Sequence, residues 1–181
     1  DEVDESLVRK LMERNVDVAT KLCGRDSVET RDAVTHLCYF FSRCHQYTDT
    51  EVLLRRHLKE PLEDNDWDEL YEVLQLYSCV LMGLGRLAEA EELLRRGIRE
   101  LSDEDRRGGA KATLARLLEQ QGKTTESHEL LSAVHSDFKR IYGPDHPMVI
   151  SASAEVTRLS DALERGTGTA CTAKCLFPSS A

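Results

Sequence analysis

Four residues that can bind a metal lie close together near position 40: His36, Cys38, Cys44 and His45. Imidazole nitrogens and thiolates are the usual ligands of structural zinc, which is held by closely spaced ligand pairs. Cys38 and Cys44 are six positions apart, which on a helix separates them by about 240° around the axis. No second ligand pair follows. The spacing therefore argues against a zinc site, and we expect neither a metal nor another cofactor.

Other reactive side chains do not form a catalytic pattern. Carboxylates cluster at Glu91-Glu92 and at residues 103–105, but on helix faces and in linkers they are ordinary surface charge, because a catalytic carboxylate needs burial or a close partner. Asp145 beside His146 offers acid–base chemistry, although a helix cap is the preferred interpretation. No phosphate-binding loop, Gly-x-Ser-x-Gly elbow or His-Glu-x-x-His motif is present. We predict no catalytic residue and a chain that is not an enzyme.

The composition favours a helical protein. The chain has 181 residues with 24 Lys and Arg against 33 Asp and Glu, which gives a formal charge of −9, and 40% of its residues are hydrophobic. That length and apolar fraction suffice for a buried core. Only four Pro and ten Gly are present, whereas Leu, Glu, Arg and Ala are abundant, as is typical of long helices. The acid excess argues against nucleic-acid binding.

The sequence also predicts where the protein is found. It has neither a long apolar run nor a basic segment followed by an apolar one at its start, so we expect no membrane span, no membrane partner and no signal peptide. Cys38 and Cys79 lie in amphipathic runs, where cysteine acts as a small buried apolar residue. We therefore expect reduced thiols and a cytoplasmic location, with Cys171 and Cys175 in an unstructured tail. Because the chain does not start with Met, we expect a processed form or a part of a longer protein.

A repeat of about 40 residues organises the chain. EVLLRRHL at 51–58 aligns without gaps with EELLRRGI at 91–98, and a third copy, ESHELLSAV, spans 126–134. Each copy follows a short turn, centred on His45, Gly85 and Gly122. A period of this length is typical of stacked helix pairs. Apolar residues recur at helical spacing on both sides of each turn, so we predict antiparallel helix pairs.

Small residues recur at two fixed positions of the repeat. They lie seven residues before each turn and five residues after it: Cys38, Ser78 and Ala115, then Thr50, Ala90 and Ser127. Small side chains allow two helices to approach closely. We therefore predict that these six positions are the buried crossing points of the pairs.

This pattern resembles the tetratricopeptide repeat, which has a small residue in its first helix, Gly at the turn and Ala early in its second helix. The segment GRLAEA at 85–90 matches it well. The loop YGPDHPMV at 142–149 is similar to the loops between kinesin-light-chain repeats, and residues 24–34 look like a degenerate copy of it. In this loop Gly143 and Pro144 can end a helix, and Pro147 suits the first turn of the next, with Asp145 or His146 near the cap.

The resemblance implies an all-α fold, an α-solenoid of about eight helices with a right-handed superhelix. It places one helical domain at 1–165, with repeats at 31–64, 71–107 and 108–142, flanking helices at 4–22 and 148–164, and a flexible tail at 166–181.

The same resemblance implies protein–protein recognition on a concave face formed by the first helix of each pair. Residues of this chain are expected on that face in all three repeats: Asp32, Thr35, His36, Tyr39 and Arg43 in the first, Glu72, Gln75, Leu76, Cys79 and Met82 in the second, and Ala112, Thr113, Arg116, Glu119 and Gln120 in the third. The paired Asn of kinesin light chains and the Lys and Asn that clamp a C-terminal carboxylate in chaperone-binding members are absent here. The groove is instead expected to be partly apolar and partly charged, through Tyr39, Leu76 and Met82 with Arg43 and Arg116, so the preferred ligand is a peptide or helix with an apolar anchor.

Three alternatives stay open. The loop at 143–147 is also similar to that of the helical C-terminal domain of SET-and-MYND lysine methyltransferases, which would make the chain a regulatory part of a larger enzyme. A self-associating structural module is the second. The third is an anion site at the paired arginines 55–56 and 95–96, for which surface ion pairs with preceding glutamates are the preferred interpretation.

Overall fold

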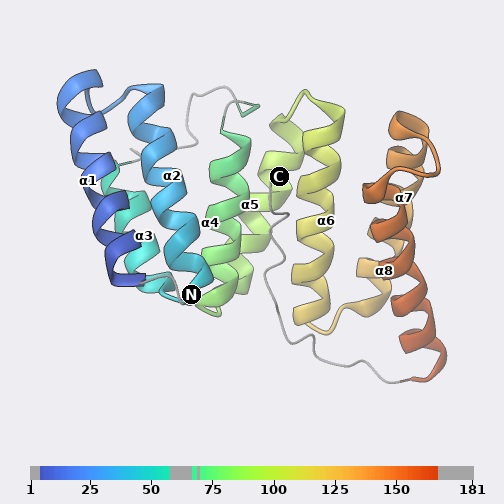
Figure 1. Ribbon diagram of the computed structural model, residues 1–181. Helices are drawn as coiled ribbons and strands as arrows, with labels where there is room; N and C mark the ends of the chain where they lie inside the picture. Colours follow the sequence, from blue (N-terminus) through green and yellow to red (C-terminus); the bar gives the residue numbers. More distant parts are fainter. Residues whose placement is uncertain (1–4, 58–66, 69, 167–181) are drawn as a thin grey trace. The chain divides into compact units, whose positions relative to one another are not determined.

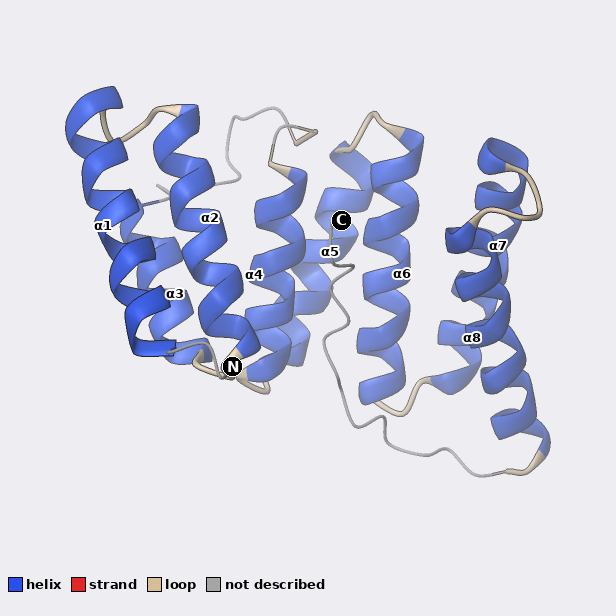
Figure 2. Ribbon diagram, viewed as in Figure 1, coloured by secondary structure: helices blue, strands red, loops and turns tan. Residues whose placement is uncertain are grey.

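The computed structural model describes residues 5–57, 67, 68 and 70–166, and these residues form eight α-helices and no strand (Figures 1 and 2). The helices are α1 (Glu5–Cys23), α2 (Val28–Arg43), α3 (Tyr47–His57), α4 (Tyr71–Gly83), α5 (Leu87–Glu100), α6 (Glu104–Gln120), α7 (Thr124–Tyr142) and α8 (Pro147–Glu164). The predicted all-α class and the helix number are confirmed for this part of the chain. The predicted start of the first helix at residue 4, the end of the first repeat at 58–64, and the tail from 167 onward with Cys171 and Cys175 lie outside the described residues.

The chain forms two compact units, Asp1–Arg86 and Leu87–Ala181. In the first unit α2 packs against α1, α3 and α4, and α3 also packs against α4. In the second unit each helix packs against the next one from α5 to α8. Its apolar core includes one cluster around Val134, Phe138 and Val149 and a second around Leu131 and Leu159.

The predicted turns end α2, α4 and α6 in the same way. His45, Gly85 and Gly122 have φ angles of 59°, 75° and 77°, a region that glycine enters without strain and that His visits more often than most residues. The amide that follows each of them donates a 2.9 Å bond back to a carbonyl in the last turn of the helix, as in a Schellman motif. Gly166 after α8 also has a positive φ, 64°, so α8 ends like the first helix of a pair.

The two longer loops are also equivalent. Gly24 and Gly143 end helices of 19 residues, α1 and α7, with φ angles of 93° and 83°. Three residues later, Ser27 caps α2 by accepting a bond from the amide of Thr30, and His146 caps α8 through Nδ1, which accepts from the amide of Met148. The predicted cap and the similarity of the two loops are confirmed. Helices α1 and α7 therefore occupy the same repeat position, 119 residues apart.

All six predicted crossing residues have no exposed surface: Cys38, Thr50, Ser78, Ala90, Ala115 and Ser127. The Ser127 hydroxyl donates a 2.7 Å bond to the Ala115 carbonyl, which joins α7 to α6 at the predicted point. Near the start of α6, a Cβ on Gly108 would lie 2.5 Å from the ring of Phe138 on α7. The close approach of this pair thus depends on small residues.

Helix α6 begins within the acidic segment that sequence reasoning assigned to surface charge and linkers. The Asp103 side chain caps the helix by accepting a 3.0 Å bond from the amide of Arg106. Glu104 and Asp105 form the first turn, where negative charge is favoured by the helix dipole. These acids therefore help to start α6.

Candidate functional site

The residues predicted to bind a partner differ in their exposure. Five of the fifteen side chains are buried: Thr35, Leu76, Cys79, Thr113 and Glu119. The other ten are exposed or half-buried: Asp32, His36, Tyr39, Arg43, Glu72, Gln75, Met82, Ala112, Arg116 and Gln120. Burial withdraws the first five side chains from solvent, whereas ligand contact stays a prediction for the ten others.

In the first unit the structure brings together predicted residues from two repeats. The Tyr39 hydroxyl on α2 donates a 2.6 Å hydrogen bond to Glu72 Oε2 on α4. Burial raises the pKa of Tyr39, and the bond to the Glu72 carboxylate raises it further. Beside them Gln75 Nε2 donates to the hydroxyl of Tyr71 at 3.1 Å. Helices α2 and α4 therefore present one continuous polar and aromatic surface.

Tyr71 was not predicted to belong to this surface. It is the first residue of α4, next to Glu72. The spacing of Tyr71 and Gln75, four positions apart on the same helix, was the signal that could have identified it.

In the second unit the predicted residue Glu119 already has a partner. Its two carboxylate oxygens accept 2.7 Å bonds from Arg158 Nη1 and Nη2 on α8. Arg158 also donates from Nε to Glu155 at 2.8 Å. The pKa of Arg158 is raised, first by the hydrogen bond to Glu119. This bidentate pair joins α6 to α8. Because Glu119 is only 4% exposed, little of its carboxylate is left for a ligand.

Sequence reasoning missed Arg158 because it treated α8 as an end piece. The signal was the loop at 143–147, which makes α8 the first helix of a further pair and hence a neighbour of other first helices. On α6 itself, Arg116 Nη2 lies 3.3 Å from the hydroxyl of Thr113. The half-buried Arg116 and the Glu119–Arg158 pair form a charged surface of the second unit.

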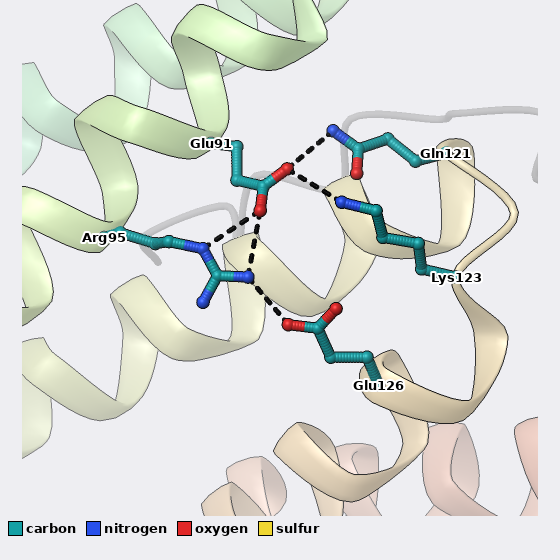
Figure 3. A network of polar contacts seen from close by, with 5 residues as sticks. All are labelled: Glu91, Arg95, Gln121, Lys123 and Glu126. Atoms are coloured by element: carbon teal, nitrogen blue, oxygen red, sulfur yellow. Dashed lines mark hydrogen bonds and ion pairs between the residues drawn. The ribbon is translucent and has the colours of Figure 1, made fainter.

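A second polar network lies on the second helices of the pairs (Figure 3). Glu91 on α5 accepts from Gln121 Nε2 at 2.9 Å and from Lys123 Nζ at 3.1 Å. Arg95 donates to Glu91 at 2.9 Å and to Glu126 on α7 at 2.7 Å. The network thus ties α5 to the turn after α6 and to the start of α7.

The first unit repeats the central contact of this network. Glu51 on α3 pairs with Arg86, the residue after the turn at Gly85, as Glu91 pairs with Lys123 after the turn at Gly122. The carboxylate of Glu51 also binds Arg55, at 2.9 Å. The predicted surface ion pairs are therefore confirmed for Arg55 and Arg95. Sequence reasoning did not predict this role for Arg86 and Lys123, the residues that directly follow the turn glycines.

We expect acid to weaken the network around Glu91. Its pKa is lowered from 4.5 to about 2, above all by the hydrogen bond from Gln121 and further by Arg95 and Lys123, against the opposing effect of partial burial. A carboxylate whose pKa is lower in the folded chain stabilises it fully above pH 4.5 and loses this effect as the pH falls toward 2. Glu91→Gln should therefore lower the melting temperature at neutral pH. Between pH 4.5 and 2, the melting temperature of this variant should fall less than that of the wild type.

Thermal unfolding followed by circular dichroism across this pH range measures the effect. Glu92→Gln is the matched control, since Glu92 is exposed on the same helix. Parallel pH profiles for Glu91→Gln and the wild type would contradict the prediction.

The four cysteines in the described residues are free thiols. Cys38 is buried, which raises its pKa to about 12, whereas His36 and His45 are exposed. No group of three or more His, Cys, Asp or Glu residues in the described part of the chain could hold a metal ion. In the same part, no helix combines the length and the apolar character needed to cross a bilayer.

Comparisons with known proteins support the repeat. The profile of the tetratricopeptide repeat family matches residues 109–147, which include most of α6, all of α7 and the loop to α8. Among solved structures, the crystal structure of BtubC (BKLC) from P. vanneervenii is similar with a TM-score of 0.75 and 19% identity, over 90% of this chain and 68% of that one. No curated protein matches the chain significantly. The predicted resemblance to tetratricopeptide repeats and the helical-repeat fold are confirmed.

Proposed function

We propose that this chain is a non-enzymatic protein-interaction module that binds a peptide or a helix of a partner on its first helices. Tetratricopeptide repeats are typically interaction modules, and residues 109–147 match their profile. The observation that carries the proposal is the joint surface of α2 and α4, where Tyr39 and Glu72 from two repeats lie in hydrogen-bond contact. Repeated first helices that share one surface suit an extended ligand.

The chemistry of the exposed residues indicates the kind of ligand. Tyr39 and Met82 are half-buried and can contact an apolar anchor, since aromatic and Met side chains are frequent at interfaces. Arg43 is exposed and Arg116 is half-buried, so both can bind carboxylates of a ligand. We therefore propose a peptide or helix that combines an apolar anchor with acidic residues.

The test compares partner capture by matched variants. Tyr39→Ala combined with Arg116→Glu should abolish partner capture, because it removes an aromatic contact on α2 and reverses a charge on α6. The control, Val52→Ala with Arg99→Glu, makes the same kinds of change at exposed residues of α3 and α5 and should leave capture intact. Affinity capture with quantitative mass spectrometry measures both, and circular dichroism checks helicity. Equal capture profiles for the wild type and the Tyr39/Arg116 variant, with helicity unchanged, would refute the proposal.

A further inference from the structure

Helix α1 carries an apolar stripe on its solvent side. Leu11, Val18 and Leu22 are 58%, 43% and 80% exposed, and their spacing places them within about 40° of one another around the helix axis. Val16, the buried residue of α1, lies about 140° from Leu11. Three large apolar side chains on one exposed stripe mark a candidate interaction surface.

Part of the equivalent face of α7 packs against a neighbouring helix. The repeat register of 119 residues aligns Leu11 with Leu130 and Val18 with Asp137. In the second unit, Asp137 binds Lys111 on α6 at 3.3 Å. Leu130 packs against the cluster that contains Ala115 of α6. Leu11 and Val18 therefore occupy positions that contact a neighbouring helix in the other copy, whereas the counterpart of Leu22, Ile141, is 36% exposed.

Positive charge borders one side of the stripe. Three basic residues of α1 lie about 60–100° from Leu11 around the helix axis: Lys10, Arg14 and Lys21. All three are exposed, and none of them forms an ion pair within the described residues. In a chain of net charge −9, this border favours a ligand with acidic residues.

Helix α8 shows that such a stripe is not a general property of the first and last helices. Ile150 is 59% exposed, but the residues that follow it on the same face are polar and exposed: Ser153, Thr157 and Asp161. This face of α8 does not complement the stripe, which argues against head-to-tail stacking of α8 of one copy on α1 of another.

We infer that the face of α1 formed by Leu11, Val18 and Leu22 with Lys10, Arg14 and Lys21 binds an amphipathic helix that has an acidic border. The bound helix lies against α1 as α6 lies against α7, with its apolar residues on the stripe and its carboxylates beside the three cations. This surface is separate from the surface of α2 and α4 on which the proposed function rests.

Two synthetic peptides of about 18 residues, long enough for five helical turns, serve as probes. Both carry one stripe of Leu and Ala, and the residues that border the stripe are Glu in one peptide and Lys in the other. The Glu peptide should bind the full chain, and its affinity should fall as the salt concentration is raised. The affinity of the Lys peptide should be lower than that of the Glu peptide by about ten-fold or more. Fluorescence polarisation of labelled peptides measures both affinities.

Variants then locate the binding site. Leu11→Asp with Val18→Asp should weaken binding of the Glu peptide by about ten-fold or more, because both changes place a charge on the apolar contact. Lys10→Glu with Arg14→Glu should weaken the Glu peptide and strengthen the Lys peptide. The matched control, Val52→Asp with Ile150→Asp, also places two carboxylates at exposed apolar sites and should change neither affinity.

Several results would overturn the inference. Equal binding of the two peptides, or binding unchanged by the Leu11/Val18 variant, would exclude an acidic helix on this face. If the chain formed a concentration-dependent dimer that Leu11→Asp abolishes, the occupant of this face would be a second copy of the chain. If the chain cosedimented with vesicles of phosphatidylserine and phosphatidylcholine, and Leu11→Asp abolished this, the occupant would be a membrane. In the Tyr39/Arg116 variant, the added changes Leu11→Asp and Val18→Asp should still weaken binding of the Glu peptide by about ten-fold or more, so failure of the proposed function can be distinguished from failure of this inference.

Discussion

Ala90→Glu should lower the free energy of unfolding by about 3–5 kcal/mol, the cost typical of an uncompensated buried charge. Ala90 has no exposed surface, and the larger side chain also overpacks its site. Its counterpart in the next repeat, Ser127, shows how close this position brings two helices, since its hydroxyl reaches the Ala115 carbonyl at 2.7 Å. We therefore expect the second repeat to unfold.

Urea unfolding followed by circular dichroism measures this loss, and Ala88→Glu is its control. Ala88 lies on the same helix but is exposed, so the same substitution there should change stability by less than about 0.5 kcal/mol. A melting temperature of Ala90→Glu within error of the wild type would show that the repeat register is wrong.

Arg158→Ala should lower the free energy of unfolding by about 2–3 kcal/mol, somewhat less than the full cost of breaking a buried pair because Arg158 is partly exposed. The substitution leaves the carboxylate of Glu119, 4% exposed, without its two bonds of 2.7 Å. The double variant Glu119→Leu with Arg158→Leu should recover most of the loss, because it removes both charges and keeps the volume filled.

Chemical denaturation of the single and double variants separates these effects. Arg165→Ala, at an exposed arginine just after α8, should leave stability nearly unchanged. If the double variant were as unstable as Arg158→Ala, the loss would come from packing on α8 and not from the unpaired carboxylate.

Much of the fold could be predicted because its determinants are local. The turns at Gly85 and Gly122 need a positive φ, which the residue type indicates directly. Ala90 and Ala115 are small where two helices meet, and both are fully buried. The loop from Gly143 to Pro147 ends one helix and starts another within five residues, so its role could be predicted without any knowledge of packing.

The candidate site could be predicted only in part. The resemblance to tetratricopeptide repeats placed Tyr39 and Glu72 on the first helices of successive repeats, and the structure shows them in contact. It also placed Leu76 on the same face, although Leu76 is fully buried. A helix has several faces that contact neighbours, and the repeat register alone does not show how many of them other helices cover.

The sequence by itself determined the elements of this protein: helix pairs with a period near 40, their turns and caps, and the small residues where the pairs cross. Only the tertiary structure decided which charges pair. Glu119 and Arg158 are 39 positions apart, and Glu91 meets Lys123 only after the intervening helix has returned the chain to α5. The reason is physical, because backbone conformation and turn strain depend on neighbouring residues, whereas an ion pair depends on distance in space.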